Sequence, residues 1–431
     1  MTTTKNNEHK KLNFSSEREQ SQACLNSAEH EKNQGRKVLN VPNLRFPEFQ
    51  GEWEEERLAD IADLYKGTGI SKDQLSDDGE PCILYGELYT KYKSETIREV
   101  ISKTNIDNTK LVRSKANDVI IPCSGETAED IATARCVLNG NILLGGDLNI
   151  IRLHGYDGAF MSYQLNGRRK YDIAKVAQGV SVVHLYGEHL KGVKTINPCL
   201  EEQKKIAKLL SLLDERIATQ NKIIDKLQSL IKGINQRVFK NSGNNYKLGE
   251  ICEIRSGYSG SQLLSKKGLK VSRIETISGH KVNLERVGYV APFESSENYK
   301  LQVGDILFSN INSVEYIGNT AFIDKDYDLY HGMNLLRLTP NHMVVIPFYL
   351  YLLLNTNRML NRFKTICNKA VSQASINQTE LGKTVIQIPP IKTQKQICEL
   401  YQALYTKLET ESHTKSLFQN QKQYLLRQMF I

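Results

Sequence analysis

The sequence contains little that would place this protein in a membrane or outside the cell. Its 431 residues include no apolar run long enough to span a bilayer. The N-terminus is polar and charged, unlike a secretory signal peptide. The eight cysteines form no CxxC pair and show no zinc-like spacing with histidine. We therefore expect reduced, structural thiols in a cytoplasmic protein that has no membrane partner.

Motifs that would mark an enzyme are also missing. There is no GxxxxGK[ST] phosphate loop, no GxGxxG that opens a helix after a strand, and no HExxH. Ser124-Gly125 and Ser181 lack the residues that flank a nucleophile elbow. His184 and His189 are interpreted as surface or packed histidines, because no further ligand-type spacing surrounds them. We expect no catalytic residue, no metal site and no cofactor bound by this chain.

The composition indicates a multidomain globular protein. Hydrophobic residues make up 40% of the chain and charged residues 24%, as in ordinary folded proteins. A chain of this length exceeds one ordinary core, so two or three domains are expected. The formal net charge of +9 is compatible with a polyanionic partner but does not by itself establish one.

One long amphipathic helix is predicted from about Leu200 to Phe239, after Pro198. Its apolar residues recur in alternating steps of four and three, which is the heptad pattern of a coiled coil. A lone helix cannot hide such a stripe, so a partner helix is expected. The predicted seam consists of Ile206, Leu210, Leu213, Ile217, Ile224, Leu227 and Ile231.

The partner helix is predicted at the end of the same chain. An offset of 191 residues places Gln203 on Gln394 and Phe239 on Phe430. The second seam is less regular, because charged residues interrupt its middle, and Glu411 aligns with Gln220. Such a polar position commonly fixes register at some cost in stability. The seam residues of this copy are Ile397, Leu404, Leu408, Phe418 and Leu425. A packing of each helix on its own domain alone is the alternative.

The segment before each helix is duplicated as well. Leu58, Ile61 and Gly67 match Leu248, Ile251 and Gly257 at an offset of 190. The run Asn149–Leu153 aligns with Asn334–Leu338 at 185, and the offset returns to 191 near Leu190. Offsets that drift only at loops are typical of a duplicated domain with divergent insertions.

The expected fold is α+β, with two duplicated α/β domains separated and joined by two long antiparallel coiled-coil helices. We expect helices at Leu58–Leu64 and Phe160–Asn166, and a linker at residues 241–245. The predicted organisation is a polar or disordered tail at 1–40, a domain at 41–198, a helix at 199–240, a domain at 241–390 and a helix at 391–431.

The loops differ between the two copies while the framework repeats. They are rich in small, hydroxyl, amide and basic side chains, which can hydrogen-bond base edges and phosphates. Solvated, variable loops are the plainer interpretation of each single residue. Candidates in the first copy are Lys66, Thr68, Lys72, Tyr89, Lys91, Ser124, Gln178, Ser181 and His184. Candidates in the second copy are Arg255, Tyr258, Lys266, Lys267, Ser278, His280, Lys281, Asn310, Asn312, Lys369, Ser372, Gln373 and Ser375.

This arrangement resembles the specificity subunit of Type I restriction–modification systems. The resemblance covers nearly everything after about residue 41. It rests on two target-recognition domains, each followed by a long helix introduced by a Pro and a Gln, at Pro198 and Gln203 and at Pro389 and Gln394. The segments Asn43–Pro47 and Trp53–Leu58 are also similar to the family. The single motifs are loose, and their duplicated order carries the resemblance.

The resemblance implies a non-catalytic subunit that recognises a bipartite site in double-stranded DNA. It implies two methyltransferase subunits and restriction/translocase subunits as partners. S-adenosylmethionine, ATP and Mg are then expected on those partners. Two other classes stay open from the residues alone: a duplicated coiled-coil adaptor that scaffolds proteins without binding DNA sequences, and an enzyme with a composite site between domains. Salt-sensitive binding to duplex DNA would distinguish the first from the specificity subunit.

Overall fold

A computed structural model of the chain describes residues 39–107, 109–179, 182–239, 243–369 and 373–431. It divides into two compact units. The first contains the chain up to Glu215 together with Gln419–Ile431, and the second contains Arg216–Phe418. The predicted tail, apart from residues 39 and 40, lies outside the described residues. Below, the first domain is the part from β1 to β13 and the second domain the part from β14 to β24.

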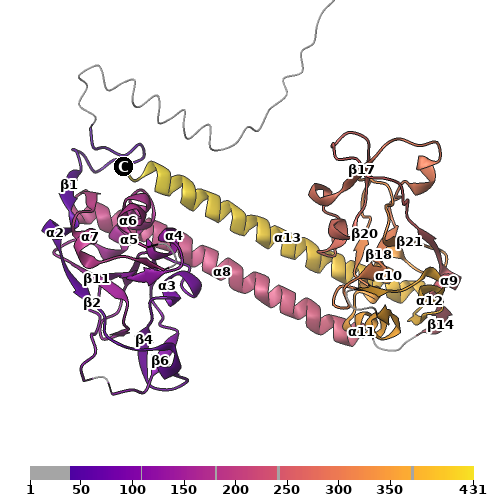
Figure 1. Cartoon of the computed structure of the whole chain (residues 1–431), viewed down its shortest axis with the longest axis horizontal. Helices are drawn as coiled ribbons and strands as arrows, with labels where there is room; N and C mark the ends of the chain where they lie inside the picture. Colours follow the sequence, from indigo (N-terminus) through magenta and orange to yellow (C-terminus); the bar gives the residue numbers. More distant parts are fainter. Residues whose placement is uncertain (1–38, 108, 180–181, 240–242, 370–372) are drawn as a thin grey trace, which may run out of the picture. The chain divides into compact units, whose positions relative to one another are not determined.

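The first domain is built on a five-stranded sheet with the order β2-β11-β7-β9-β5 (Figure 1). Every residue of its central strand β7 is buried, as expected for a strand covered on both faces. The strands of this sheet are β2 (Ala62–Lys66), β5 (Thr96–Ile97), β7 (Asp118–Pro122), β9 (Arg135–Val137) and β11 (Leu148–Leu153). A second sheet contains β3 (Leu75–Ser76), β4 (Glu80–Ile83), β6 (Ser102–Thr104) and β10 (Leu143–Leu144).

Short helices and two small strand pairs complete the first domain. The pair formed by β1 (Glu54–Arg57) and β13 (Lys194–Asn197) brings the two ends of the domain together. The second pair is formed by β8 (Ser124–Gly125) and β12 (Val183–His184). The helices are α2 (Leu58–Ile61), α3 (Glu87–Thr90), α4 (Ala128–Ile131), α5 (Gly158–Asn166), α6 (Lys170–Val176) and α7 (Gly187–Lys191).

The second domain repeats this plan with a four-stranded sheet in the order β15-β21-β18-β20. These strands are β15 (Cys252–Ser256), β18 (Ile306–Ser309), β20 (Thr320–Phe322) and β21 (Leu335–Pro340). Smaller pairings involve β14 (Asn244–Lys247), β16 (Leu269–Val271), β17 (Gly288–Val290), β19 (Ile311–Asn312), β22 (Asn368–Lys369), β23 (Ala374–Ser375) and β24 (Val385–Ile388). Its α-helices are α9 (Leu248–Ile251), α10 (Pro347–Leu354), α11 (Asn357–Ile366) and α12 (Gln378–Gly382). Sheet order alone therefore confirms the duplication.

The strand pairing corrects one part of the predicted alignment. Val119 pairs with Ile151 in the first domain, whereas Ile306 pairs with Leu338 in the second. The structural offset of this strand is therefore 187, and the predicted offset of 185 was wrong by two residues. A shift of two preserves the alternation of buried and outward side chains, so the sequence pattern could not reveal it. The left-handed turn residues Asp147 and Asn334, with φ of 58° and 62°, are the true equivalents.

Two predicted boundaries were also wrong. The helix expected at Leu58–Leu64 ends at Ile61, because residues from Ala62 onward join the central sheet as β2. Part of the expected linker is strand β14, in which Asn244 and Asn245 pair with β24. In both places backbone pairing with a distant strand overrides the local sequence preference.

A buried glutamine fixes the start of each long helix. Gln203 accepts a hydrogen bond from Asp157 N at 2.9 Å and donates to Pro198 O at 2.8 Å. Gln394 accepts from Ile346 N and donates to Pro389 O, both at 2.8 Å. The repeated Pro and Gln thus join the helix entry to the turn before α5 or α10. Both side chains are fully buried, so these bonds satisfy polar groups that water cannot reach.

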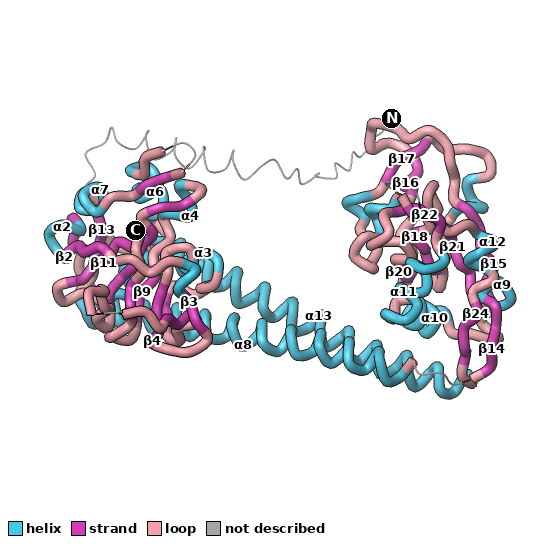
Figure 2. The backbone as a smooth tube through the Cα atoms, turned by 60° about the horizontal axis from the view of Figure 1, so that its bottom comes forward, coloured by secondary structure: helices cyan, strands magenta, loops and turns pink. Residues whose placement is uncertain are grey.

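The long helices are α8 (Leu200–Val238) and α13 (Ile391–Gln428), and they lie side by side within each unit (Figures 1 and 2). In the second unit, Gln220 contacts Glu411 and Asn235 contacts Tyr401. Residue numbers rise along α8 while those of its partners on α13 fall, so the two helices pair antiparallel, as predicted. All twelve predicted seam residues are buried or half-buried, whereas most positions between them are exposed.

The segment before the first domain covers the end of the chain within the first unit. Leu44 N donates to Gln428 O at 2.9 Å, and Arg45 forms a two-bond ion pair with buried Glu202 at 2.7 and 2.8 Å. Trp53 lies edge-on to Phe160 and to Phe430, whose rings stack on each other at 5.1 Å. The only tryptophan therefore anchors the C-terminus on the first domain.

Candidate nucleic-acid interface

In the first domain, the β8–β12 pair brings three predicted residues together. The Ser124 Oγ lies 3.2 Å from Nδ1 of His184, which is the residue opposite it in the pair. The backbone of His184 exchanges two hydrogen bonds with that of Gln178, at 2.9 and 2.7 Å. A hydroxyl, an imidazole and an amide therefore lie next to each other at a half-buried sheet edge. These groups can both donate and accept hydrogen bonds, as base edges require.

Aromatic and basic side chains surround this pair. Tyr186 is 53% exposed and stacks against His184 with 6.2 Å between ring centroids. His189 meets the edge of Tyr186 at 5.5 Å. Burial raises the pKa of the neighbouring Cys123 thiol to about 11, and the nearby Lys66 ammonium partly opposes that rise. Lys66 thus lies close to the β8–β12 pair and supplies positive charge beside its polar groups.

In the second domain, the equivalent place is the β19–β23–β22 sheet. Ile311 pairs with Ser375, and Asn312 pairs with Ala374. Lys369 of β22 also pairs with Ala374, so Asn312 and Lys369 lie on either side of Ala374 in one small sheet, and Ser375 is the next residue along β23. Next to it is a cavity of about 130 Å³ lined in part by Ser278, Ser309, Asn312, Tyr316 and Asn319. The cavity brings Ser278 and Asn312 together, although 34 residues separate them in the sequence.

The two small sheets occupy corresponding positions in their domains but present different chemistry. Ser124 and His184 of the first domain correspond in strand pairing to Ile311 and Ser375 of the second. Both sheets continue directly from the central strand β7 or β18. The framework therefore presents a hydroxyl–imidazole pair in one copy, and an isoleucine opposite a serine, next to Asn312, in the other.

Several predicted residues have partners inside their own unit. The Lys91 ammonium lies 2.5 Å from the Glu87 carboxylate and 2.8 Å from Ser102 Oγ. Arg255 pairs with Glu253, and Lys281 pairs with Glu409 of α13. Tyr258 stacks on Phe293 with 4.0 Å between ring centroids. These contacts give each residue a structural role beside any role in binding.

The other predicted residues remain on the domain surfaces or outside the description. Tyr89 is half-buried near Glu126 and Asp130, and His280 has a left-handed backbone with φ of 58°. The Oδ1 atom of Asn310 is buried without a hydrogen-bond partner among the described residues. Ser181 and Ser372 lie outside the described residues. The exposed residues are Lys66, Thr68, Lys72, Gln178, Lys266, Lys267, Ser278 and Gln373.

Sequence reasoning missed five residues of these two places. Tyr186 and His189 flank the first pair, while Ser309, Tyr316 and Asn319 line the cavity of the second domain. An exposed tyrosine beside two histidines was a signal that could have identified the first group. Ser309 and Asn319 are buried, so only the fold shows that they face a cavity.

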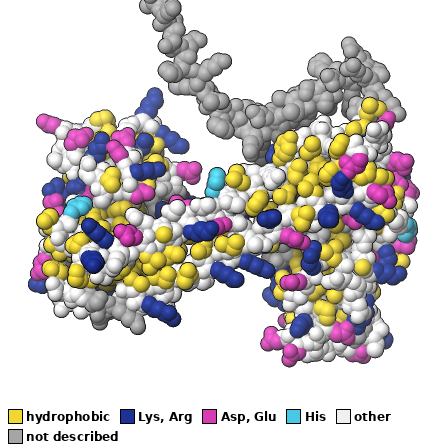
Figure 3. Space-filling model, turned by 180° about the vertical axis from the view of Figure 1, so that it is seen from behind, with side chains coloured by type: hydrophobic (Ala, Val, Ile, Leu, Met, Phe, Trp, Pro, Cys, Tyr) yellow, Lys and Arg dark blue, Asp and Glu magenta, His cyan; other side chains and the backbone are white. Residues whose placement is uncertain are grey.

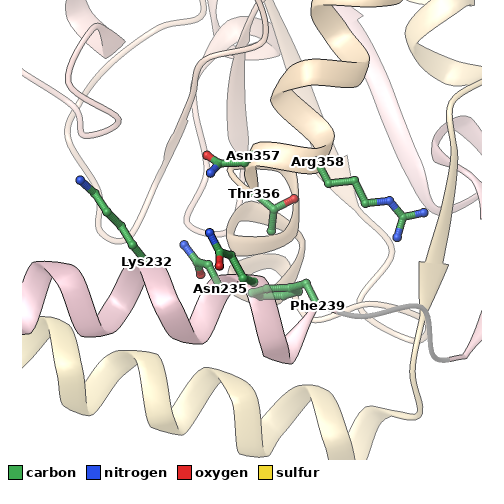
Figure 4. A pocket seen from close by; sticks show the side chains of 7 residues that line it. Lys232, Asn235, Phe239, Thr356, Asn357 and Arg358 are labelled. Atoms are coloured by element: carbon green, nitrogen blue, oxygen red, sulfur yellow. The ribbon is translucent and has the colours of Figure 1, made fainter.

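Larger hollows lie elsewhere in the described part of the second unit, and one of about 690 Å³ is lined in part by the predicted residues His280 and Lys281. A groove of about 600 Å³ lies between the end of α8 and the start of α11, with Lys232 and Arg358 at opposite ends (Figure 4). None of the predicted residues lines it. The described residues contain no cluster of His, Cys, Asp and Glu suited to a metal ion. Within the same residues, no helix is both long and apolar enough to cross a membrane.

On one face of the molecule, charged side chains are spread out rather than concentrated. On the face shown in Figure 3, lysine and arginine side chains are scattered over both domains and along the long helices, with acidic residues between them. Electrostatic attraction to a polyanion would therefore come from many separate contacts.

The family model described as "Type I restriction modification DNA specificity domain" matches residues 50–229 and again residues 242–417. Each match covers one domain and part of the helix that follows it.

Curated relatives carry corresponding names. The MjaX specificity subunit of Methanocaldococcus jannaschii is 39% identical over 188 residues, or 43% of this chain and 44% of that protein. The MjaVIII specificity subunit from the same organism is 24% identical, covering 89% of this chain and 92% of the relative. The EcoKI specificity subunit of Escherichia coli is 22% identical over 83% of each chain.

Among solved structures, the S subunit of a Type I restriction–modification system from M. genitalium has the same fold. Its TM-score is 0.61 at 17% identity, over 91% of this chain and 99% of that one.

Proposed function

Because this chain belongs to the Type I restriction–modification DNA specificity family, we propose that its two domains read the two halves of a bipartite site in double-stranded DNA. The single observation that supports this most strongly is the pair of corresponding small sheets. They share one framework and carry different hydrogen-bonding side chains. A duplicated framework with divergent readers is suited to two different half-sites.

Each small sheet carries side chains suited to base recognition. In the first domain, the His184 ring accepts or donates through Nε2 while Ser124 holds Nδ1. In the second domain, the Asn312 amide donates to Ser309 Oγ at 3.0 Å and accepts from Ser313 N at 2.8 Å, which holds it in place and leaves one N–H and one oxygen lone pair for a base edge. Lys66 and Lys369 would contact phosphates and set the register, because phosphate contacts position a protein without specifying sequence.

The proposed complex contains two methyltransferase subunits and restriction/translocase subunits. In that complex, methyl transfer from S-adenosylmethionine and the use of ATP and Mg belong to the partners, and this chain supplies recognition. The long helices would set the spacing of the half-sites. A 39-residue helix spans roughly 58 Å at 1.5 Å per residue, more than the 34–36 Å of one DNA turn.

A domain exchange tests this function directly. Residues 47–198 are replaced by the corresponding domain of a relative, and the methylated motif is determined by sequencing genomic DNA from cells that also make the partner subunits. One half of the motif should change while the other half and the spacer stay the same. A hybrid that changes both half-sites together would contradict separate reading.

A matched insertion tests the role of the helices. One heptad is added after Gln220 and one after Glu411, which preserves both seams because each gains a full repeat. The spacer of the methylated motif should change while both half-sites are retained. An unchanged spacer would show that the helices do not set the distance.

A further inference from the structure

A buried ion cluster joins the end of α13 to the first domain. The Lys422 ammonium lies 2.5 Å from Glu95 and 2.6 Å from Asp214 of α8, and all three side chains are about nine-tenths buried. Asp214 also accepts hydrogen bonds from Tyr163 OH at 2.7 Å and Ser94 Oγ at 3.0 Å. Such a cluster is stable only when every member has its partners.

The corresponding place in the second unit is apolar. The helix offset of 191 places Lys422 on Ile231 and Asp214 on Tyr405. Gln203 binds the backbone N–H of Asp157 before α5, and Gln394 binds that of Ile346 before α10, so α5 and α10 correspond at an offset of 189. Tyr163 therefore corresponds to Leu352. Ile231 and Leu352 belong to the hydrophobic core of the second unit, and Tyr405 packs against it. Each helix end therefore carries the chemistry of the domain on which it docks.

A second polar contact lies between residues that are equivalent in the two copies. Gln220 donates to the Glu411 backbone carbonyl at 3.1 Å and contacts its carboxylate. Gln220 and Glu411 are related by the same offset of 191. If α8 paired with α8 of a second chain, Gln220 would therefore face Gln220, and if α13 paired with α13, Glu411 would face Glu411. Two copies of Glu411 would then meet at one seam position, and like charges at such a position repel.

We propose that these two contacts make the halves of this chain selective for each other, so that α8 pairs with α13 and neither helix pairs with a second copy of itself. In a pairing of two first halves, Ile231 of the other copy would lie against Asp214 and Glu95 and leave both carboxylates without their lysine. In a pairing of two second halves, Lys422 would be buried against Tyr405 and Leu352. The occupant that fits the first domain is the C-terminal helix of this chain.

The test uses the full chain with a protease site placed at residues 240–242 and cut after purification. Two preparations that carry different N-terminal tags are unfolded together, refolded and captured through one tag. Recovery of the other N-terminal tag measures pairing of like halves, and recovery of a C-terminal tag measures pairing of unlike halves. Unlike pairing should exceed like pairing by about a hundredfold, because breaking a buried ion pair typically shifts an equilibrium by two or more powers of ten.

Two variants should reduce this preference from opposite sides. Lys422→Ile gives α13 the residue that α8 carries at the equivalent position, so unlike pairing should weaken about a hundredfold. Glu95→Gln with Asp214→Asn removes the buried negative charges, so like pairing of first halves should rise. Lys415→Ile is the matched control, because Lys415 is half-buried on α13 one heptad before Lys422 and lies outside the cluster. It should leave the preference unchanged.

A double-mutant cycle on the uncut chain tests the same contact without refolded fragments. Asp214→Asn and Lys422→Met are measured singly and together by chemical unfolding of the first unit. Their coupling should change the unfolding equilibrium at least about tenfold, as for contacting buried charges. Equal recovery of like and unlike halves, or additive effects in the cycle, would overturn the proposal. Neither assay contains DNA, so failure here would leave the proposed function intact.

Discussion

The two domains share a backbone plan, yet their most buried polar contacts differ. The first unit holds Lys422, Asp214 and Tyr163 in one polar cluster where the second has Ile231, Tyr405 and Leu352. In contrast, the glutamine at each helix entry and the glycine after β2 or β15 are the same. Residues that fix backbone geometry were therefore retained, while residues that choose a partner diverged. The comparison separates positions that build either domain from positions that give each its own role.

The largest effects are expected at the shared glycines. A Cβ on Gly67 would lie 2.1 Å from Gly145 O, and one on Gly257 would lie 1.9 Å from Gly332 O. Gly67→Ala and Gly257→Ala should each destabilise their own domain by about 3 kcal/mol or more, because backbone must move. Chemical unfolding followed by hydrogen exchange of each domain measures this.

Two other glycines serve as controls for that experiment. At Gly69 and Gly279 an added Cβ would meet no described atom within 4 Å, so Gly69→Ala and Gly279→Ala should be nearly neutral. A large effect in only one domain would show that the shared turn is required in one copy and not in the other.

The next effect concerns the helix entries. Gln203→Ala and Gln394→Ala should each cost about 1–3 kcal/mol, because a backbone N–H loses its acceptor and at least one backbone carbonyl loses its donor. Hydrogen exchange should quicken at Asp157 N in the first variant and at Ile346 N in the second. Gln228→Ala and Gln396→Ala, on exposed positions of the same helices, are the controls. If a single variant quickened exchange equally at Asp157 N and Ile346 N, the two helix entries would not be independent of each other.

A pH effect should distinguish the two domains. Burial lowers the pKa of His331 to about 4, and its first-domain equivalent is the apolar Leu144. The unfolded chain binds a proton near pH 6.5 that the folded domain does not take up until about pH 4. The stability that the second domain gains from a neutral His331 is therefore fully present above pH 6.5. It is lost as the pH falls from about 6.5 toward 4.

Between pH 7.5 and pH 5 the second domain should lose about 2 kcal/mol of stability from this residue, since one pKa unit corresponds to about 1.4 kcal/mol. Chemical unfolding at both pH values measures the loss. His331→Leu should remove this dependence, and the first domain should not show it. A pH dependence that survives the substitution would assign it to another group.

The smallest effect concerns phosphate contacts. Lys66→Ala should lower the slope of log affinity against log salt by about one for duplex DNA, because one phosphate contact is lost. Lys91→Ala is the informative comparison, since its ammonium is held by Glu87 and Ser102. It should leave the slope unchanged while reducing stability. Fluorescence anisotropy at several salt concentrations distinguishes the two.

Much of the fold follows from periodicity alone. The heptad steps from Ile206 to Ile231 predicted a helix that needs a partner, and the repeated Pro and Gln placed that partner at 391–431, where the structure has a helix over Ile391–Gln428. Both signals are local or repeated, so one sequence contains them in full. The boundary at Ile61 and the strand β14 were missed, because each depends on pairing with a strand more than eighty residues away.

The sequence by itself determined the duplication, the two long helices and the family resemblance. Each of these follows from the order and spacing of residues along the chain. Only the tertiary structure decided which polar residues meet, since Glu95, Asp214 and Lys422 come from three distant segments. It also showed the true strand register, because a shift of two residues leaves every side chain on the same face. Contacts between distant segments depend on how the chain packs, and residue spacing does not specify that packing.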